Sequence, residues 1–478
     1  MEDQKTNSYS SSSLFDLSKT LMLGFLILVF LLGASCNSIE SKPNIILFYI
    51  DDLGWTDLNC YGSDLYETPH IDQLAQEGIR FTNAYSACTV CSPSRAAIMT
   101  GKYPARLHLT DWIRGYQHPN PRLKVPDWQM FLDTAEYTIA EALRDHGYNT
   151  AVVGKWHLGD DPIYWPDNQG FDVNIGGYRW GAPGSYFYPY HGNRRDGMHP
   201  PGLEAGEEGE YLTDRLTDEA NSFIRQNAHQ PFFVYFPHYA VHTPIQAPDS
   251  LTEYFQGKIQ ENSRHNNAEY AAMILKMDES IGKVRSTLRD LEIEDNTAII
   301  FTSDNGGLEL FNITDNGIIR DGKGSAYEGG VRVPFIAHLP NISEAGSISD
   351  QPIIGQDLYP TILDIAGIEV ISNDGISLLQ LFQDKGHKLS RDAIYWHYPH
   401  YHRGGATPYS AIRKGNMKLI EFFEDGRLEM YNLEEDPGEA QNLAQVKVDL
   451  AEELHAELQQ WREDVGAQYP SANPDYVP

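Results

Sequence analysis

Four mostly apolar runs lie in the first two thirds of the chain. They cover residues 43–50, 149–153, 231–236 and 297–302. Apolar runs of this kind indicate strands that are buried on both faces of a sheet. Residues 138–146 and 268–291 place apolar side chains at helical spacing, which predicts amphipathic helices between some of the strands. The alternation predicts an α/β fold with a sheet covered by helices.

The pattern changes near residue 391. Short strand-like runs separated by turn residues cover 393–398, 409–412, 417–423 and 427–431, and a helical pattern covers 448–462. This arrangement predicts a smaller α+β subdomain after the main domain. We expect the main domain to span residues 36–390 and the C-terminal subdomain to span residues 391–478.

A targeting segment is predicted at the N-terminus. Residues 21–32 are almost wholly apolar and follow Lys19, a pattern typical of a signal peptide and too short for a membrane span. The small residues before Cys36 resemble a bacterial lipobox, although Gly33 stands where leucine is usual. We expect residues 1–35 to be a leader that is cleaved before a lipidated Cys36. The protein would then be a periplasmic or cell-envelope lipoprotein, and plain secretion is the alternative.

Acidic and amide side chains follow two of the predicted strands. Asp51 and Asp52 come directly after the first strand, and Asp304 and Asn305 come after the fourth. In α/β sheets, ligands bind at the carboxyl ends of the strands. One Asp-Asp pair alone would more often mark a turn. Together the four oxygen-bearing residues favour a site for Ca²⁺, or less favourably Mg²⁺.

A cysteine precedes a predicted helix in residues 91–101. Pro93 is tolerated in a first helical turn, and Ser92 or Ser94 could cap free backbone donors there. Cys91 would therefore lie at a helix N-terminus, where an anion is favoured, and Arg95 adds positive charge one turn later. A lone cysteine in such a place is more often buried and inert.

Four segments resemble the signatures of one enzyme family. Residues 91–101 match the Cys-x-Pro-Ser-Arg signature of the formylglycine-dependent (type I) sulfatases, and residues 147–159 match their second signature. Residues 238–244 and 322–334 resemble two further segments of that family. The chain is therefore similar to the arylsulfatase-like members of the alkaline phosphatase superfamily. The resemblance implies a large mixed sheet flanked by helices, with sulfuric ester hydrolysis in the main domain.

The resemblance also implies a role for each matching residue. A maturation enzyme would convert Cys91 to formylglycine, whose hydrate attacks sulfur. One divalent ion, usually calcium, would be bound by residue 91 together with the side chains that follow the two strands, namely Asp51, Asp52, Asp304 and Asn305. The other implied catalytic residues bind sulfate or move protons, and they are Arg95, Lys155, His157, His242 and Lys323.

The overall charge narrows the range of partners. The net charge is −31, which disfavours nucleic acid and anionic membrane surfaces, so we expect membrane contact only through the lipid anchor. An anionic substrate would also be repelled unless its site concentrates positive charge. Four cysteines are too few for a disulfide scaffold, although a Cys60–Cys88 disulfide is possible after export.

Three segments outside the signatures are rich in aromatic, histidine and arginine residues. They are residues 106–116, 178–195 and 396–403, the last from the C-terminal subdomain. Aromatic faces stack on sugar rings, and arginine and histidine bind hydroxyls and anions. The substrate-binding residues predicted on this basis are His108, Asp111, Trp112, Arg114, Trp180, His191, Arg194, Arg195, His397, His400 and Arg403. Packing between domains is the alternative for each segment.

The side chains of these three segments favour a sulfated oligosaccharide or polysaccharide as the substrate. Algal galactans, ulvan and glycosaminoglycans all fit. Two other functions stay open. Related phosphonate monoester and phosphodiester hydrolases share the Cys-x-Pro-x-Arg pattern, and a carbohydrate-binding lipoprotein with an unmodified Cys91 would need no catalysis.

Overall fold

The computed structural model describes residues 1, 4, 42–194, 196–370 and 372–477. The expected leader core, the lipidation site Cys36 and Arg195 lie outside the described residues. Residues 42–478 belong to one compact unit. Within the described residues, no helix combines the length and the apolar character that crossing a membrane requires.

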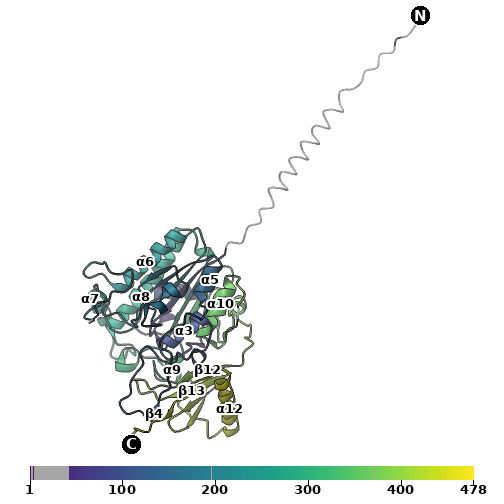
Figure 1. The fold of residues 1–478 in the computed structure, drawn as a ribbon. Coiled ribbons are helices and arrows are strands. Elements are labelled where there is room, and N and C mark those ends of the chain that lie inside the picture. Colours follow the sequence, from purple (N-terminus) through teal and green to yellow (C-terminus); the bar gives the residue numbers. More distant parts are fainter. Residues whose placement is uncertain (2–3, 5–41, 195, 371, 478) are drawn as a thin grey trace. The chain divides into compact units, whose positions relative to one another are not determined.

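An eight-stranded mixed sheet forms the centre of this unit (Figure 1). In spatial order its strands are β10 (Ser347–Ser349), β2 (Ile79–Phe81), β9 (Phe335–His338), β8 (Thr297–Ser303), β1 (Asn44–Ile50), β7 (Phe232–Pro237), β5 (Asn149–Val153) and β6 (Val173–Ile175). The four strands expected from the apolar runs are the central ones, β8, β1, β7 and β5, and they run parallel. The antiparallel β9 makes the sheet mixed, which confirms the expected fold class.

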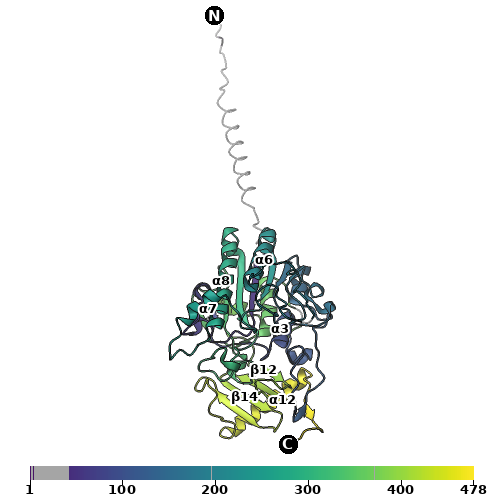
Figure 2. The ribbon, with the colours of Figure 1, turned by 90° about the vertical axis from the view of Figure 1, so that its left-hand side faces the viewer.

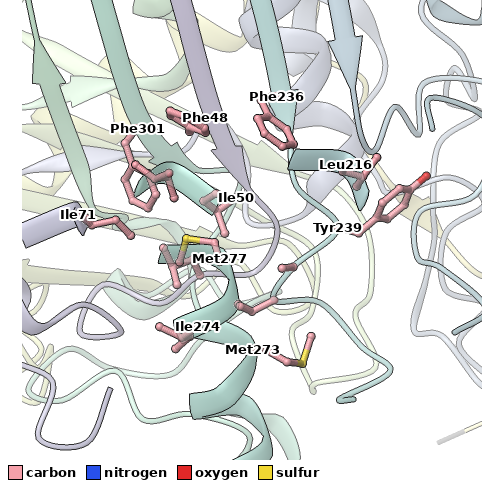
Figure 3. Close-up of a cluster of buried hydrophobic side chains, with 14 of the residues drawn as sticks. Phe48, Ile50, Ile71, Leu216, Phe236, Tyr239, Met273, Ile274, Met277 and Phe301 are labelled. Carbon is pink, nitrogen blue, oxygen red and sulfur yellow. The ribbon is translucent and has the colours of Figure 1, made fainter. Parts of the chain in front are cut away.

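Helices cover both faces of the sheet. Successive side chains of a strand point to opposite faces, and in the central strands both sets are apolar, so each face must be covered. Ile46, Phe48 and Ile50 of β1 face one core, and the residues between them face the other. The first face is covered by α2 (Pro69–Glu77), α6 (Leu212–Asn227), α7 (Asp249–Gln256) and α8 (Ala268–Asp290). The second is covered by α3 (Cys91–Thr100), α5 (Ile139–Asp145), α10 (Leu358–Ile365) and α11 (Leu379–Gln383). The long helix α8 lies beside α6 (Figure 2), and its Met273, Ile274 and Met277 pack below the strands (Figure 3).

The C-terminal subdomain is an antiparallel sheet with one helix against it. Its strands are β12 (Ala393–Tyr398), β13 (Tyr409–Lys414), β14 (Met417–Phe422) and β15 (Leu428–Asn432), and α12 (Val448–Asp464) packs on β13 and β14. Buried Lys418 of β14 pairs with Glu328 of the short helix α9 (Glu328–Val331), with 3.0 Å between Nζ and Oε1. The α+β architecture expected from the sequence is confirmed, and this ion pair joins it to α9 of the main domain.

Two short strand pairs lie outside these sheets. One pair is β3 (Ala84–Tyr85) with β11 (Ile353–Ile354), and the other is β4 (Leu123–Lys124) with β16 (Ser471–Ala472). The short helix α4 (Pro104–Leu107) follows α3. The β4–β16 pair brings the C-terminal segment back to the main domain, near the segments predicted to bind substrate.

Candidate active site

The central parallel strands end at one edge of the sheet, and the predicted site residues lie there. Backbone hydrogen bonds connect the loops that follow the strands: Asp51 N donates to Ala240 O, and Asp304 N donates to Ile50 O. Lys155 N donates to Pro237 O in the same way. These bonds fix the backbone that carries the carboxylates, the lysine and the histidines. The sequence-predicted core residues are therefore brought together at this edge.

Cys91 is the first residue of α3, at the helix N-terminus as the motif predicts, and its side chain is buried. The helix ends at Gly101, whose φ of 69° suits glycine. The expected serine caps are wrong, because no side chain caps this helix. The Ser92 hydroxyl instead donates to His157 O at 2.9 Å, and the Ser94 hydroxyl donates to Cys88 O at 2.9 Å. The serines thus fasten the helix start to its neighbouring loops.

His157 lies beside the cysteine. Its Nδ1 is 3.4 Å from Cys91 Sγ, and its Nε2 is 2.5 Å from Ile113 O. A carbonyl accepts only, so Nε2 carries the proton and Nδ1 presents its lone pair to position 91. Burial, reinforced by the Lys155 charge, holds the pKa of His157 well below its usual value. The ring is therefore a neutral acceptor aimed at residue 91.

Three buried oxygens at this edge have no hydrogen-bond partner within the described residues. They are Asp51 Oδ1, Asp52 Oδ2 and Asn305 Oδ1. Ligand atoms of Asp51, Asp52 and His242 all lie within 4.8 Å of one another. Buried acceptors without donors are costly unless a cation binds them, and hard oxygens suit Ca²⁺ or Mg²⁺. The residues present therefore fit a divalent ion.

Basic side chains balance the carboxylates. Lys155 Nζ lies 2.7 Å from Asp51 Oδ2, and Lys323 Nζ lies 2.5 Å from Asp52 Oδ1. Burial raises the pKa of Asp52, but the charge of Lys323 outweighs it and the net direction is downward. Burial lowers the pKa of His242 to about 3, so this ring is neutral. The carboxylate stays ionised, as a metal ligand must.

Arg95 lies behind the carboxylates and is fully buried. Its Nε and one terminal nitrogen donate to Asp304 Oδ2 at 3.0 and 2.7 Å, and another nitrogen donates to Lys155 O. Asp304 Oδ1 accepts from the backbone N–H of Asp52. In this structure Arg95 therefore contacts Asp304 and the second-signature loop. It does not line the pocket above Cys91.

A pocket of about 440 Å³ opens above these residues. Cys91, His157, His242 and Lys323 line it, and Lys323 and His242 connect it to Asp52. Four arginines also line it, against a single carboxylate, Asp160. On a chain with a net charge of −31, this local excess of positive charge favours an anionic ligand.

A family comparison identifies the fold and its chemistry. The model described as "Sulfatase" matches residues 43–368, which cover the whole sheet edge and the pocket floor. The chain belongs to the sulfatase family. A second model, "N-sulphoglucosamine sulphohydrolase, C-terminal", matches residues 322–464. Members of the family are sulfuric ester hydrolases, and this protein is one of them.

Similar proteins support the same conclusion. Human N-acetylgalactosamine-6-sulfatase is 34% identical over 388 residues, which are 76% of this chain and 70% of that protein. A sulfatase of Formosa agariphila is 30% identical, with 94% of each chain covered. The crystal structure of Ps i-CgsB in complex with k-i-k-neocarrahexaose has a TM-score of 0.74 and 32% identity, and the match covers 89% of this chain and 93% of that one.

The walls of the sulfatase pocket include five of the predicted substrate-binding residues. They are Trp112, Arg114, Trp180, Arg194 and Arg403. The Trp180 ring contacts two guanidinium groups, with Arg194 at 4.1 Å and Arg179 at 4.9 Å from its centroid. The prediction missed Arg179, His402 and Asp160. Arg179 and His402 lie inside the predicted segments. The composition of the sequence therefore predicted which segments line the pocket, but not which side chains of each segment do so.

Five other residues predicted to bind substrate lie away from this pocket in the structure. These side chains are held by internal hydrogen bonds and do not line the sulfatase pocket: His108 contacts Gly466 O, His191 contacts Gly192 O, His397 contacts Ser410 and Gln468 O, His400 contacts Thr110, and Asp111 accepts from the Tyr398 hydroxyl. They orient the wall segments. Cys60 and Cys88 are free thiols, so the possible disulfide between them is absent.

Proposed function

We propose that this sulfatase removes sulfate from sulfated carbohydrates, using a formylglycine made from Cys91 and a Ca²⁺ ion. The observation that carries the proposal is the neutral His157 facing Cys91 beside three buried oxygens without donors, below a pocket rich in arginine. The names of the relatives agree with a sugar substrate, since one is an N-acetylgalactosamine-6-sulfatase and one neighbour structure holds a neocarrahexaose.

The ion would be bound by Asp51 and Asp52, whose ligand oxygens lie within 4.8 Å of each other and of a His242 ring nitrogen. Asn305, whose buried Oδ1 has no hydrogen-bond partner within the described residues, and Asp304 would complete the set. Mg²⁺ fits less well, because it prefers to retain several waters and binds few protein ligands. When present, Ca²⁺ would supply positive charge for the sulfate oxygens, and the formylglycine hydrate would supply the attacking hydroxyl.

The chain's own residues would then bind the ester and move protons. Lys155 and Lys323 would contact sulfate oxygens, and Arg95 would keep Asp304 in place. His157 Nδ1 would accept a proton from the group at position 91. The Nδ1 of His242 faces Thr243 O, so the neutral ring presents the lone pair of Nε2 to the pocket. Binding of the anionic ester would favour protonation of Nε2, and that proton would then pass to the departing sugar oxygen.

The test compares matched substrates on protein made together with a formylglycine-generating enzyme. We expect turnover of an aryl sulfate to exceed that of the matching aryl phosphodiester. A clear preference for the phosphodiester would favour the related phosphonate monoester and phosphodiester hydrolases. The remaining alternative is a carbohydrate-binding lipoprotein without catalysis, and mass spectrometry of the peptide containing Cys91 tests it. An intact thiol, together with no desulfation, would favour that alternative.

The export proposal rests on the N-terminal sequence pattern alone. We propose that the protein is carried to the bacterial cell envelope and anchored by lipid on Cys36. A radiolabelled fatty acid should label the protein, and Cys36→Ser should abolish the label. Absence of label from the native protein would indicate plain secretion instead, and label retained in Cys36→Ser would place the lipid on another residue.

A further inference from the structure

A second pocket adjoins the active-site pocket. It has a volume of about 370 Å³ and shares His402 and Arg403 with the active-site pocket. Its residues come from the segment before β4, the loop between β12 and β13, the turn between β14 and β15, and the C-terminal segment. They include Tyr116, His118, Arg122, Tyr401, Arg403 and Glu424. A chain of sugar units could therefore pass from one pocket to the other at Arg403.

Two arginines in the second pocket are exposed and have no ion pair or side-chain hydrogen bond with any described residue. They are Arg122 and Arg403. Elsewhere in the described chain arginines are commonly paired, as Arg106 is with Asp374 at 2.8 Å. The single carboxylate lining the pocket, Glu424, accepts from the Tyr401 hydroxyl at 2.7 Å. Guanidinium groups left free on so acidic a protein are available for an anionic ligand.

Aromatic rings form another wall of the pocket. The Tyr401 and His118 rings lie 4.7 Å apart between centroids, and Tyr116 meets His118 edge-on at 6.2 Å. The Tyr401 hydroxyl also accepts from Leu123 N at 2.9 Å, so that its ring is held at both ends. Tyr401 is buried and supports His118, whereas Tyr116 and His118 are partly exposed and can pack against the apolar faces of sugar rings.

We propose that the second pocket binds a neighbouring sugar unit that carries its own anionic group. The proposal rests on the proposed sulfatase function, because the first unit must place its sulfate ester above Cys91. Arg122 and Arg403 are then specificity-determining residues that contact this second anion, a sulfate ester or a uronate carboxylate. The substrate is an oligosaccharide with at least two negative charges.

Binding of three tetrasaccharides to protein with an unmodified Cys91, measured by calorimetry, tests the proposal without turnover. Maltotetraose is neutral, a hyaluronan tetrasaccharide carries carboxylates, and a sulfated neocarratetraose carries sulfates. We expect at least one anionic probe to bind more tightly than maltotetraose. Arg122→Ala should weaken that binding about tenfold, the loss of one charge-assisted contact. The probe whose binding is weakened by Arg122→Ala shows whether the recognised anion is a sulfate or a carboxylate.

Arg144→Ala is the matched control, because Arg144 is also exposed and lies on α5, outside both pockets. Anionic probes that bind no better than maltotetraose would overturn the proposal, and so would equal losses in Arg122→Ala and Arg144→Ala. Turnover of an aryl sulfate by the matured protein is read separately. Absence of aryl sulfate turnover would contradict the sulfatase function. Normal turnover, together with unchanged probe binding in Arg122→Ala, would contradict only the role of the second pocket.

Discussion

At the scale of single residues, the site depends on partners that motifs do not reveal. The signatures predict that Arg95 and His157 belong to the site. They do not predict that Arg95 faces Asp304, or that Ile113 O fixes the proton on His157. Those contacts depend on loops that meet only after the strands pair. Motif matching therefore predicts which residues gather, and packing decides what each one contacts.

Arg95→Met should destabilise the fold strongly. The substitution leaves the buried Asp304 carboxylate without the guanidinium that donates twice to its Oδ2, and breaking a buried pair in this way typically costs about 3–5 kcal/mol. Urea unfolding measures the change. Arg106→Met is the control, since its pair with Asp374 is partly exposed and is worth about 1 kcal/mol or less. Equal losses in the two variants would contradict the buried role of Arg95.

Gly181→Ala should disable the site while the fold persists. A Cβ there would lie 2.3 Å from Cε1 of His157, so the ring must move away from Cys91. Displacing a catalytic group by about 1 Å can cost about 100-fold in rate. Aryl sulfate turnover by the matured variant measures this, with Gly257→Ala as the control because its nearest neighbour is at 3.5 Å. Unchanged turnover in Gly181→Ala would count against a role for His157.

At the scale of elements, the joint between the main domain and the C-terminal subdomain contains a buried acid. Asp111 accepts from the hydroxyl of Tyr398 in β12 at 2.9 Å. Burial raises the pKa of Asp111 to about 8. The folded state therefore binds a proton more tightly than the unfolded state does, so this group destabilises the fold progressively as pH rises from about 4 to about 8.

Asp111→Asn should reduce that dependence. The free energy of unfolding of the native protein should fall relative to the variant between pH 5 and pH 8, by more than about 1 kcal/mol. Urea unfolding at the two pH values checks the difference. A constant difference between the two proteins would show that Asp111 is ionised throughout the range.

The strands that could be predicted from the sequence are those whose side chains are buried on both faces of the sheet. The runs that form β1, β5, β7 and β8 are apolar on both faces, and their predicted bounds are within one or two residues of the observed ones. The strands β6, β9 and β10 have only three or four residues, too few for a pattern to emerge. His397 was predicted as a wall residue from composition, but the sheet turns its ring toward Ser410 and Gln468.

At the scale of the whole molecule, an acidic protein surrounds a positively lined pocket and a cluster of free oxygens. Ca²⁺ should therefore stabilise the fold, by about 2.7 kcal/mol at a free concentration one hundred times Kd. Thermal unfolding with Ca²⁺, with Mg²⁺ and with a chelator measures the effect. The shift should shrink in Asp51→Asn. An equal shift in that variant would place the ion elsewhere.

The most direct measurement is sulfate released from a defined sulfated oligosaccharide by the protein matured with a formylglycine-generating enzyme. The native protein should release sulfate, and Cys91→Ala treated in the same way should release none. Sulfate release by Cys91→Ala, or its absence from a native protein shown by mass spectrometry to carry formylglycine, would contradict the assignment of Cys91 and of the activity.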